Sequence, residues 1–170
     1  RPHPPPRPGP SGDGLDEIAL GTRSWFGERM AKFICPTTIL TGPGSLAQLG
    51  EVVRPWGGKA LVVIGCGGAA GAGLLDRVRS LLTDAGLAVD VFSGVLPEPP
   101  CRQVEQLRAH LARSASDLVV ALGGGSVMDV AKAGAILHFS DKPATWHLAT
   151  QKVPARALPL VALPTTAGTG

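Results

Sequence analysis

Residues 117–133 read Asp117-Leu-Val-Val-Ala-Leu-Gly-Gly-Gly-Ser-Val-Met-Asp-Val-Ala-Lys-Ala133, and this stretch decides the fold. It opens with a short, unbroken apolar run from Leu118 to Leu122, which is typical of a strand buried on both faces. Three glycines follow, and the next residues place apolar side chains at helical spacing. A strand that passes through a glycine turn into a helix brings unpaired backbone N–H groups and a partial positive charge to one point. The stretch therefore predicts a cradle for a diphosphate.

Ordinary helix packing would explain part of the same stretch. Ser126 and Asp129 fit an S-x-x-D capping box, and Asp129 could pair with Lys132 on the helix surface. Three consecutive glycines in a strand-to-helix turn are harder to explain without a ligand, because they leave the backbone unshielded. We therefore favour the cradle.

Strands and helices alternate along most of the chain. The hydrophobic pattern predicts strands at Ala60–Ile64, Leu87–Phe92, Leu118–Leu122 and Leu158–Leu163. It predicts helices after Ser45, which can act as the N-cap, over Leu74–Thr83, over Cys101–Arg113 and from the glycine turn to about Phe139. This order predicts an α/β fold that is Rossmann-like, with a mostly parallel sheet and helices on both faces.

The two ends of this pattern are less regular. Residues 1–24, which begin with a run rich in Pro and Gly, are expected to form a disordered tail, and residues 25–170 the domain. Lys32–Cys35 and Thr37–Thr41 are predicted to be two short strands at an edge. Residues 140–157 are polar and irregular, and we expect a loop there.

Three turns emerge at the carboxyl ends of the predicted strands, which is where parallel sheets bind ligands. They are Gly65–Gly73, Gly123–Ser126 and Pro164–Gly170, and all three are rich in Gly, Ser or Thr. One nucleotide lying across them would explain this composition. Thr165 and Thr166 can donate hydroxyls to that ligand, although hydroxyl-to-backbone turns would use the same residues.

The first of these turns indicates which cofactor is bound. Gly65-Cys-Gly-Gly-Ala-Ala70 fits the G-x-G-x-x-G/A pattern, but the acidic partner expected at a later strand end is missing, since Asp90 is mid-strand. We therefore assign the turn beginning at Gly65 to the floor beneath an adenosine ribose. With no Asp or Glu in it, nothing repels a 2′-phosphate, which favours NADP over NAD.

Composition excludes several other functions. The chain has 170 residues, a net charge of +3 and 4% aromatic residues, without a dense basic stripe, so we expect no nucleic-acid partner. No apolar run is long enough to span a membrane. The three cysteines have no metal or redox spacing, which suits a reducing cytoplasm. The histidines show no ligand spacing and no catalytic triad is evident, so we expect neither a metal site nor catalytic residues in this chain.

Two ordered motifs, Ala121–Ala133 and Leu163-Pro-Thr-Thr-Ala-Gly-Thr-Gly170, closely resemble the N-terminal half of the iron-containing (group III) alcohol dehydrogenases. The resemblance extends from about Phe33 to Gly170 and includes Thr41-Gly-Pro-Gly-Ser-Leu46 and Val95-Leu-Pro-Glu-Pro99. It implies a dehydroquinate synthase-like N-terminal domain that binds NAD(P).

The resemblance also implies roles for individual residues. Gly124, Gly125 and Ser126 would hold the cofactor diphosphate, and Asp129 would lie beside the nicotinamide half. Thr165 and Thr166 would line the same cofactor. Gly65 stands where NAD-using members often carry Asp, as in NADP-using members.

One departure concerns the metal. The family's iron or zinc is held by an Asp and three His in a helical C-terminal domain, which would begin after Gly170 and is absent. The resemblance therefore implies a fragment that is inactive alone, from an oxidoreductase acting on an alcohol or aldehyde, with a homodimer as the assembly to test. Two alternatives stay open: a free-standing nucleotide-binding module without catalysis, and a relative of dehydroquinate synthase or glycerol-phosphate dehydrogenase, against which Thr165-Thr-Ala-Gly-Thr169 argues.

Overall fold

The computed structural model describes residues 37–66 and 73–166. None of the helices in this part is long and apolar enough to cross a membrane. In chain order the elements are the 3-10 helix η2 (Ser45–Gln48), α2 (Leu49–Val53), the 3-10 helix η3 (Arg54–Trp56), β1 (Lys59–Gly65), α3 (Leu74–Asp84), β2 (Ala88–Val95), α4 (Cys101–Ser114), β3 (Leu118–Gly123), α5 (Gly125–Leu137), α6 (Ala144–Thr150) and β4 (Leu160–Pro164).

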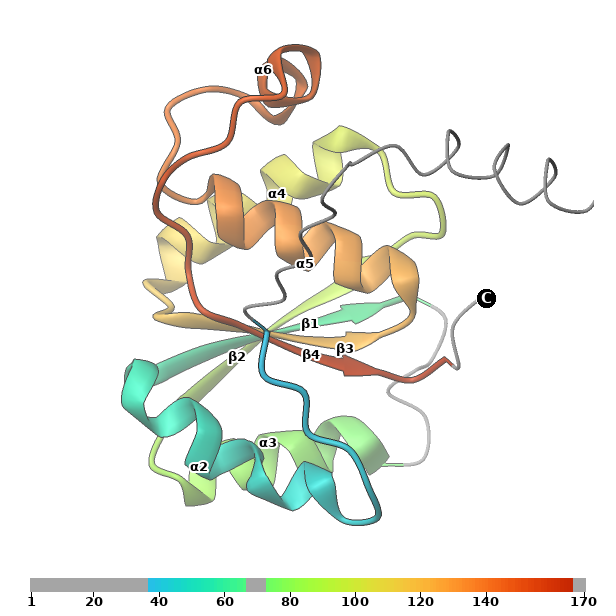
Figure 1. Cartoon of the computed structure of the whole chain (residues 1–170), viewed down its shortest axis with the longest axis vertical. Helices are drawn as coiled ribbons and strands as arrows, with labels where there is room; N and C mark the ends of the chain where they lie inside the picture. Colours follow the sequence, from blue (N-terminus) through green and yellow to red (C-terminus); the bar gives the residue numbers. More distant parts are fainter. Residues whose placement is uncertain (1–36, 67–72, 167–170) are drawn as a thin grey trace, which may run out of the picture. The chain divides into compact units, whose positions relative to one another are not determined.

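The four strands form one sheet in the order β2-β1-β3-β4, and every neighbouring pair is parallel (Figure 1). The predicted parallel α/β fold is therefore confirmed. All four strands end at the same edge of the sheet, where β1 reaches Gly65, β3 reaches Gly123 and β4 reaches Pro164. The ends of β1, β3 and β4, at which the predicted turns begin, therefore lie side by side.

Helices cover both faces of the sheet. Figure 1 shows α4 and α5 on one side and α2 and α3 on the other. Because side chains alternate along a strand, Leu61 and Val63 pack in the core beneath α4 and α5, whereas Val62 and Ile64 pack in the core beneath α2 and α3. β3 is buried along its whole length, which explains why its sequence is an unbroken apolar run.

A glycine fixes how closely the two helices on the first face approach. A Cβ built on Gly134 of α5 would lie 2.5 Å from Cδ2 of Leu107 on α4, a distance that real atoms do not adopt. Gly134 thus lets Leu107 pack directly on the α5 backbone. This packing holds α5, and with it the N-terminus of the helix, firmly against the domain.

The prediction of a loop over residues 140–157 is wrong in part, because α6 forms within it. Its seven residues are too few to show a helical period in the sequence. The helix also depends on a distant residue, since the backbone N–H of Ala144 donates to Oε1 of Glu105 at 2.5 Å, across 39 positions. Local sequence therefore could not reveal it.

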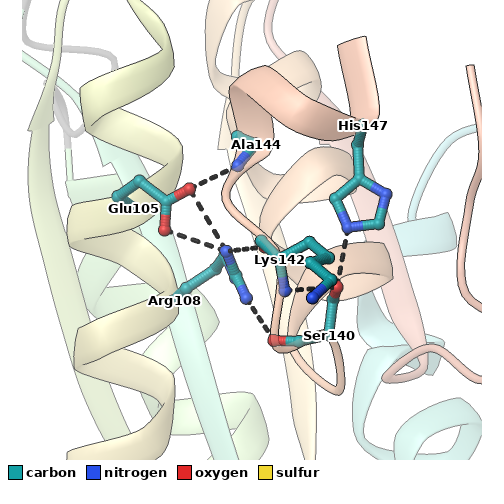
Figure 2. Close-up of polar contacts among 6 residues, drawn as sticks. All are labelled: Glu105, Arg108, Ser140, Lys142, Ala144 and His147. Atoms are coloured by element: carbon teal, nitrogen blue, oxygen red, sulfur yellow. Dashed lines mark hydrogen bonds and ion pairs between the residues drawn. The ribbon is translucent and has the colours of Figure 1, made fainter. Parts of the chain in front are cut away.

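A polar cluster ties this segment to α4 (Figure 2). Arg108 is paired with Glu105 at 2.9 Å and also donates to the backbone carbonyls of Ser140 at 2.5 Å and Lys142 at 3.0 Å. Nδ1 of His147 lies 2.6 Å from a backbone carbonyl, so it carries the proton, and its Nε2 accepts from the Ser140 hydroxyl at 2.7 Å. The cluster fixes α6 through hydrogen bonds to backbone groups.

Two predictions near the start of the described part are also wrong. Thr37–Thr41 is irregular and exposed, and its residues take part in no strand pairing within the described part of the chain. Ser45 does not cap a helix, because Gly44 is the N-cap of η2 and no side chain bonds there. The tail over residues 1–24 and the strand over Lys32–Cys35 lie outside the described residues.

Candidate functional site

A groove of about 200 Å³ opens at the carboxyl ends of β1 and β3. Three elements form it: the end of β1, the segment that follows β2, and the turn into α5. Its lining residues are Gly65, Cys66, Val95, Pro97, Gly124, Gly125, Ser126 and Val127. Four of the residues predicted for cofactor binding, Gly65, Gly124, Gly125 and Ser126, are thus brought around one groove.

The N-terminus of α5 borders this groove, and no side chain caps it. Gly124 is the N-cap, with extended backbone angles (φ −86°, ψ −170°), and no side chain bonds to the helix end. The backbone N–H groups of the first turn have no partners within the helix, so the end attracts an anion. None of the lining residues carries a charge that would oppose one.

The alternative roles offered for Ser126 and Asp129 are not realised. Ser126 lies inside the first turn of α5, so it is not the N-cap of a capping box. Asp129 forms no ion pair with Lys132. The polar pattern of this stretch is therefore not explained by helix stability alone.

The three glycines of the turn differ in what surrounds them. A Cβ built on Gly123 would lie 2.7 Å from Cγ2 of Val127, so packing of the turn against its own helix requires a glycine there. A Cβ on Gly125 would meet nothing within 4 Å. The packing of the fold therefore does not require a glycine at position 125. Gly125 is exposed and borders the groove.

The predicted threonines follow β4, beside the same turn. The backbone N–H of Thr165 donates to the carbonyl of Gly123 at 2.9 Å. The side chain of Thr166 lies against Gly124, where an added Cβ would be 3.4 Å from its Cγ2. Parallel pairing of β3 and β4 produces both contacts.

Asp129 does not line the groove. It is an exposed residue on α5, beyond the first turn of the helix, and its proposed place beside the nicotinamide remains a prediction. The predicted turns extend over residues 67–72 and 167–170, which lie outside the described part of the structure.

Sequence reasoning missed one wall of the groove. Val95 and Pro97 line the groove together with the glycine turn, although Val95–Pro99 was recognised only as part of the family resemblance. The available signal was its position, because the segment follows the carboxyl end of a parallel strand like the other three turns.

The described residues offer no second chemical centre. In residues 37–66 and 73–166, no three His, Cys, Asp or Glu side chains lie close enough together to hold a metal ion. Cys66 and Cys101 are both free thiols. The chemical feature that the described residues do offer is the uncapped N-terminus of α5 at the groove.

Comparison with known proteins shows what the chain resembles. The family model described as iron-containing alcohol dehydrogenase matches residues 36–170. Long-chain-alcohol dehydrogenase 1 of Geobacillus thermodenitrificans is 35% identical over 144 residues, which are 83% of this chain and 36% of that protein. The NADPH-dependent butanol dehydrogenase of Clostridium saccharobutylicum is 36% identical over 104 residues, or 61% of this chain and 26% of that protein.

Solved structures agree with the sequence matches. The crystal structure of NADH-dependent butanol dehydrogenase A from Thermotoga maritima superimposes with a TM-score of 0.77 at 28% identity, over 82% of this chain and 35% of that one. This chain therefore spans only about a third of the length of such proteins.

Proposed function

The chain belongs to the iron-containing alcohol dehydrogenase family, and we propose that it is the cofactor-binding part of an oxidoreductase that transfers a hydride between NAD(P)H and an alcohol or aldehyde. One observation carries this proposal: the N-terminus of α5 opens, without a cap, into a groove bordered by Gly124 and Gly125. A nicotinamide dinucleotide carries the diphosphate that such a helix end attracts.

The chain's own residues contribute binding and orientation. The nicotinamide cofactor supplies the hydride chemistry when it is bound. Gly124, Gly125 and Ser126 hold the diphosphate through backbone N–H groups, and Thr165 and Thr166 line the same cofactor. Asp129, one turn further along α5, faces the nicotinamide half. Gly65, at the end of β1, forms the floor beneath the adenosine ribose.

We propose NADP as the preferred cofactor. No Asp or Glu lines the groove, so its described walls do not repel a 2′-phosphate. The names of relatives support both cofactors, since one butanol dehydrogenase is named NADPH-dependent and another NADH-dependent. The preference therefore rests on the charge of the groove.

The metal of the family does not fit the described residues of this chain, which bring together no set of ligands for it. We propose that iron or zinc is held by another part of the whole protein. The alcohol or aldehyde would likewise contact residues outside this chain. The chain by itself would then bind cofactor without turning it over.

We further propose a cytoplasmic homodimer for the whole protein. Free Cys66 and Cys101 suit a reducing compartment. Light scattering on the whole protein would test the assembly.

Cofactor titration tests the site directly. The parent chain is expected to bind NADPH and to enhance its fluorescence, whereas Gly125→Val places a branched side chain in the diphosphate path and should abolish binding. Gly58→Val is the matched control, because Gly58 has equally open surroundings but precedes β1 at the opposite end of the strand. Equal binding by parent and Gly125→Val would refute the assignment.

A further inference from the structure

Strand β2 ends in an irregular pairing beside the groove. Val63 of β1 pairs with Phe92 of β2, but Gly65 pairs with Val95, so β2 contains one residue more than β1 over this interval. Such a bulge bends the strand and leaves backbone groups without their ladder partners. Gly94 lies within the bulge at φ +91°, a conformation that side chains disfavour.

A buried side chain from α4 bonds to both sides of this bulge. Gln103 is only 6% exposed. Its Nε2 donates to the carbonyl of Gly94 at 3.0 Å, and its Oε1 accepts from the N–H of Leu96 at 3.0 Å. Both halves of the amide are thus used, and they bracket Val95.

Val95 connects the bulge to the groove. Val95 borders the groove together with the first residues of α5, its side chain is buried in the core, and its carbonyl accepts from the N–H of Cys66 at 3.0 Å. Pro97, one residue beyond Leu96, lines the same groove. The position of this wall, and of the backbone at the end of β1, therefore depends on how the bulge is held.

We propose that Gln103 is a positioning residue for the cofactor site: by holding Gly94 and Leu96 it fixes the Val95–Pro97 wall at the distance from α5 that a dinucleotide requires. Gln103 does not line the groove itself and acts through Val95. The inference rests on the proposed function, since it assumes that the groove holds the cofactor.

Two variants of Gln103 disrupt its hydrogen bonds to Gly94 and Leu96 in different ways. Gln103→Met has similar volume but cannot bond to either backbone group. Gln103→Glu keeps an oxygen for the Leu96 N–H but places a second oxygen against the Gly94 carbonyl. Each leaves at least one buried polar group without a partner, so we expect the Kd for NADPH to rise about tenfold or more in both.

The control variant must lower the stability of the fold without changing any residue that contacts the groove or the bulge. Ser114 is also buried on α4, and its hydroxyl bonds to that of Ser116 at 2.8 Å, at the opposite end of the helix. Ser114→Ala removes this buried hydrogen bond, and we expect the Kd for NADPH to stay within about twofold of the parent.

Fluorescence titration of the 170-residue chain, with the folded fraction measured by circular dichroism, separates positioning from stability. A positioning role raises the Kd while the number of sites per folded chain stays constant. A purely structural role lowers the number of binding-competent chains and leaves the Kd unchanged, which would overturn the proposal, as would failure of both variants to fold. Absence of NADPH binding by the parent would instead overturn the proposed function, and this inference with it.

Discussion

Thr166 lies against Gly124, so that a Cβ built on the glycine would stand 3.4 Å from Cγ2 and 3.6 Å from Oγ1 of the threonine. The two residues follow different strands and meet because β3 and β4 pair in parallel, with Gly123 opposite Pro164. A hydroxyl is thereby placed beside the turn into α5, where the diphosphate is proposed to bind.

The hydroxyl of Thr166 should contribute to cofactor affinity. Thr166→Val keeps the shape of the side chain but removes the donor, and we expect the Kd for NADPH to rise by about tenfold or more, because one hydrogen bond to a charged partner contributes about 1.5–3 kcal/mol. Thr166→Ser keeps the hydroxyl and should bind nearly as the parent does. If Thr166→Val binds like the parent, the residue only packs against Gly124.

A negative charge introduced at position 65 should change the preference between NADPH and NADH. Gly65→Asp introduces a carboxylate into the groove near the proposed ribose, where it would repel a 2′-phosphate. We expect the ratio of NADPH to NADH affinity to fall about tenfold, which corresponds to about 1.4 kcal/mol. Gly65→Asn has the same size without the charge and controls for steric effects. An unchanged ratio in Gly65→Asp would place the adenosine end elsewhere.

The isolated chain should bind cofactor but not catalyse hydride transfer. No described cluster of side chains can hold the metal of the family, so substrate activation is not available in this part. Incubation with butanol or butanal, NAD(P)(H) and added Fe²⁺ or Zn²⁺ should give no change in absorbance at the reduced nicotinamide band. Turnover by the purified 170-residue chain would contradict this expectation.

Stability should depend on pH through Asp90. Nε2 of His110 lies 2.9 Å from Oδ2 of Asp90, and this hydrogen bond is the main cause that holds the pKa of the Asp90 carboxyl below its ordinary value of 3.8. A lowered pKa means that the charged form is favoured in the folded state. Its contribution is therefore present above about pH 3.8 and is lost as the pH falls through the lowered pKa.

Urea unfolding of Asp90→Asn checks this dependence. The carboxyl is 39% exposed, so the variant should lose at most about 1 kcal/mol at pH 6. The difference from the parent should shrink below pH 3.8, once the parent carboxyl is protonated. In a His110→Gln background the pH dependence of the Asp90 effect should be weaker. A difference that is constant from pH 6 to pH 2.5 would exclude the charge as its source.

The central part of the fold could be predicted because it is encoded locally. Strands β1 and β3 are unbroken apolar runs, which only positions buried on both faces can accommodate. Helices α3, α4 and α5 show apolar residues at helical spacing, and their predicted limits lie close to the observed ones. The glycine turn after β3 indicated the position of the groove.

The errors share one physical cause. Helix α6 begins where Oε1 of Glu105 accepts a hydrogen bond from the N–H of Ala144. Thr37–Thr41 has the composition of a strand but forms no ladder in the described residues. In each case a hydrogen-bond partner, not the local pattern, decides the outcome.

The sequence by itself determined the α/β class, the alternation of strands and helices along the chain, and the glycine turn that leaves the N-terminus of α5 uncapped. Only the tertiary structure decided which residues meet there: Thr166 beside Gly124, and Val95 and Pro97 across from Gly125. Hydrophobic periodicity and glycine conformation act over a few residues and can be recognised along the chain. The order of the strands within the sheet, the bulge in β2 and the hydrogen bonds of Gln103 depend on contacts between different elements. They therefore exist only once the sheet has formed.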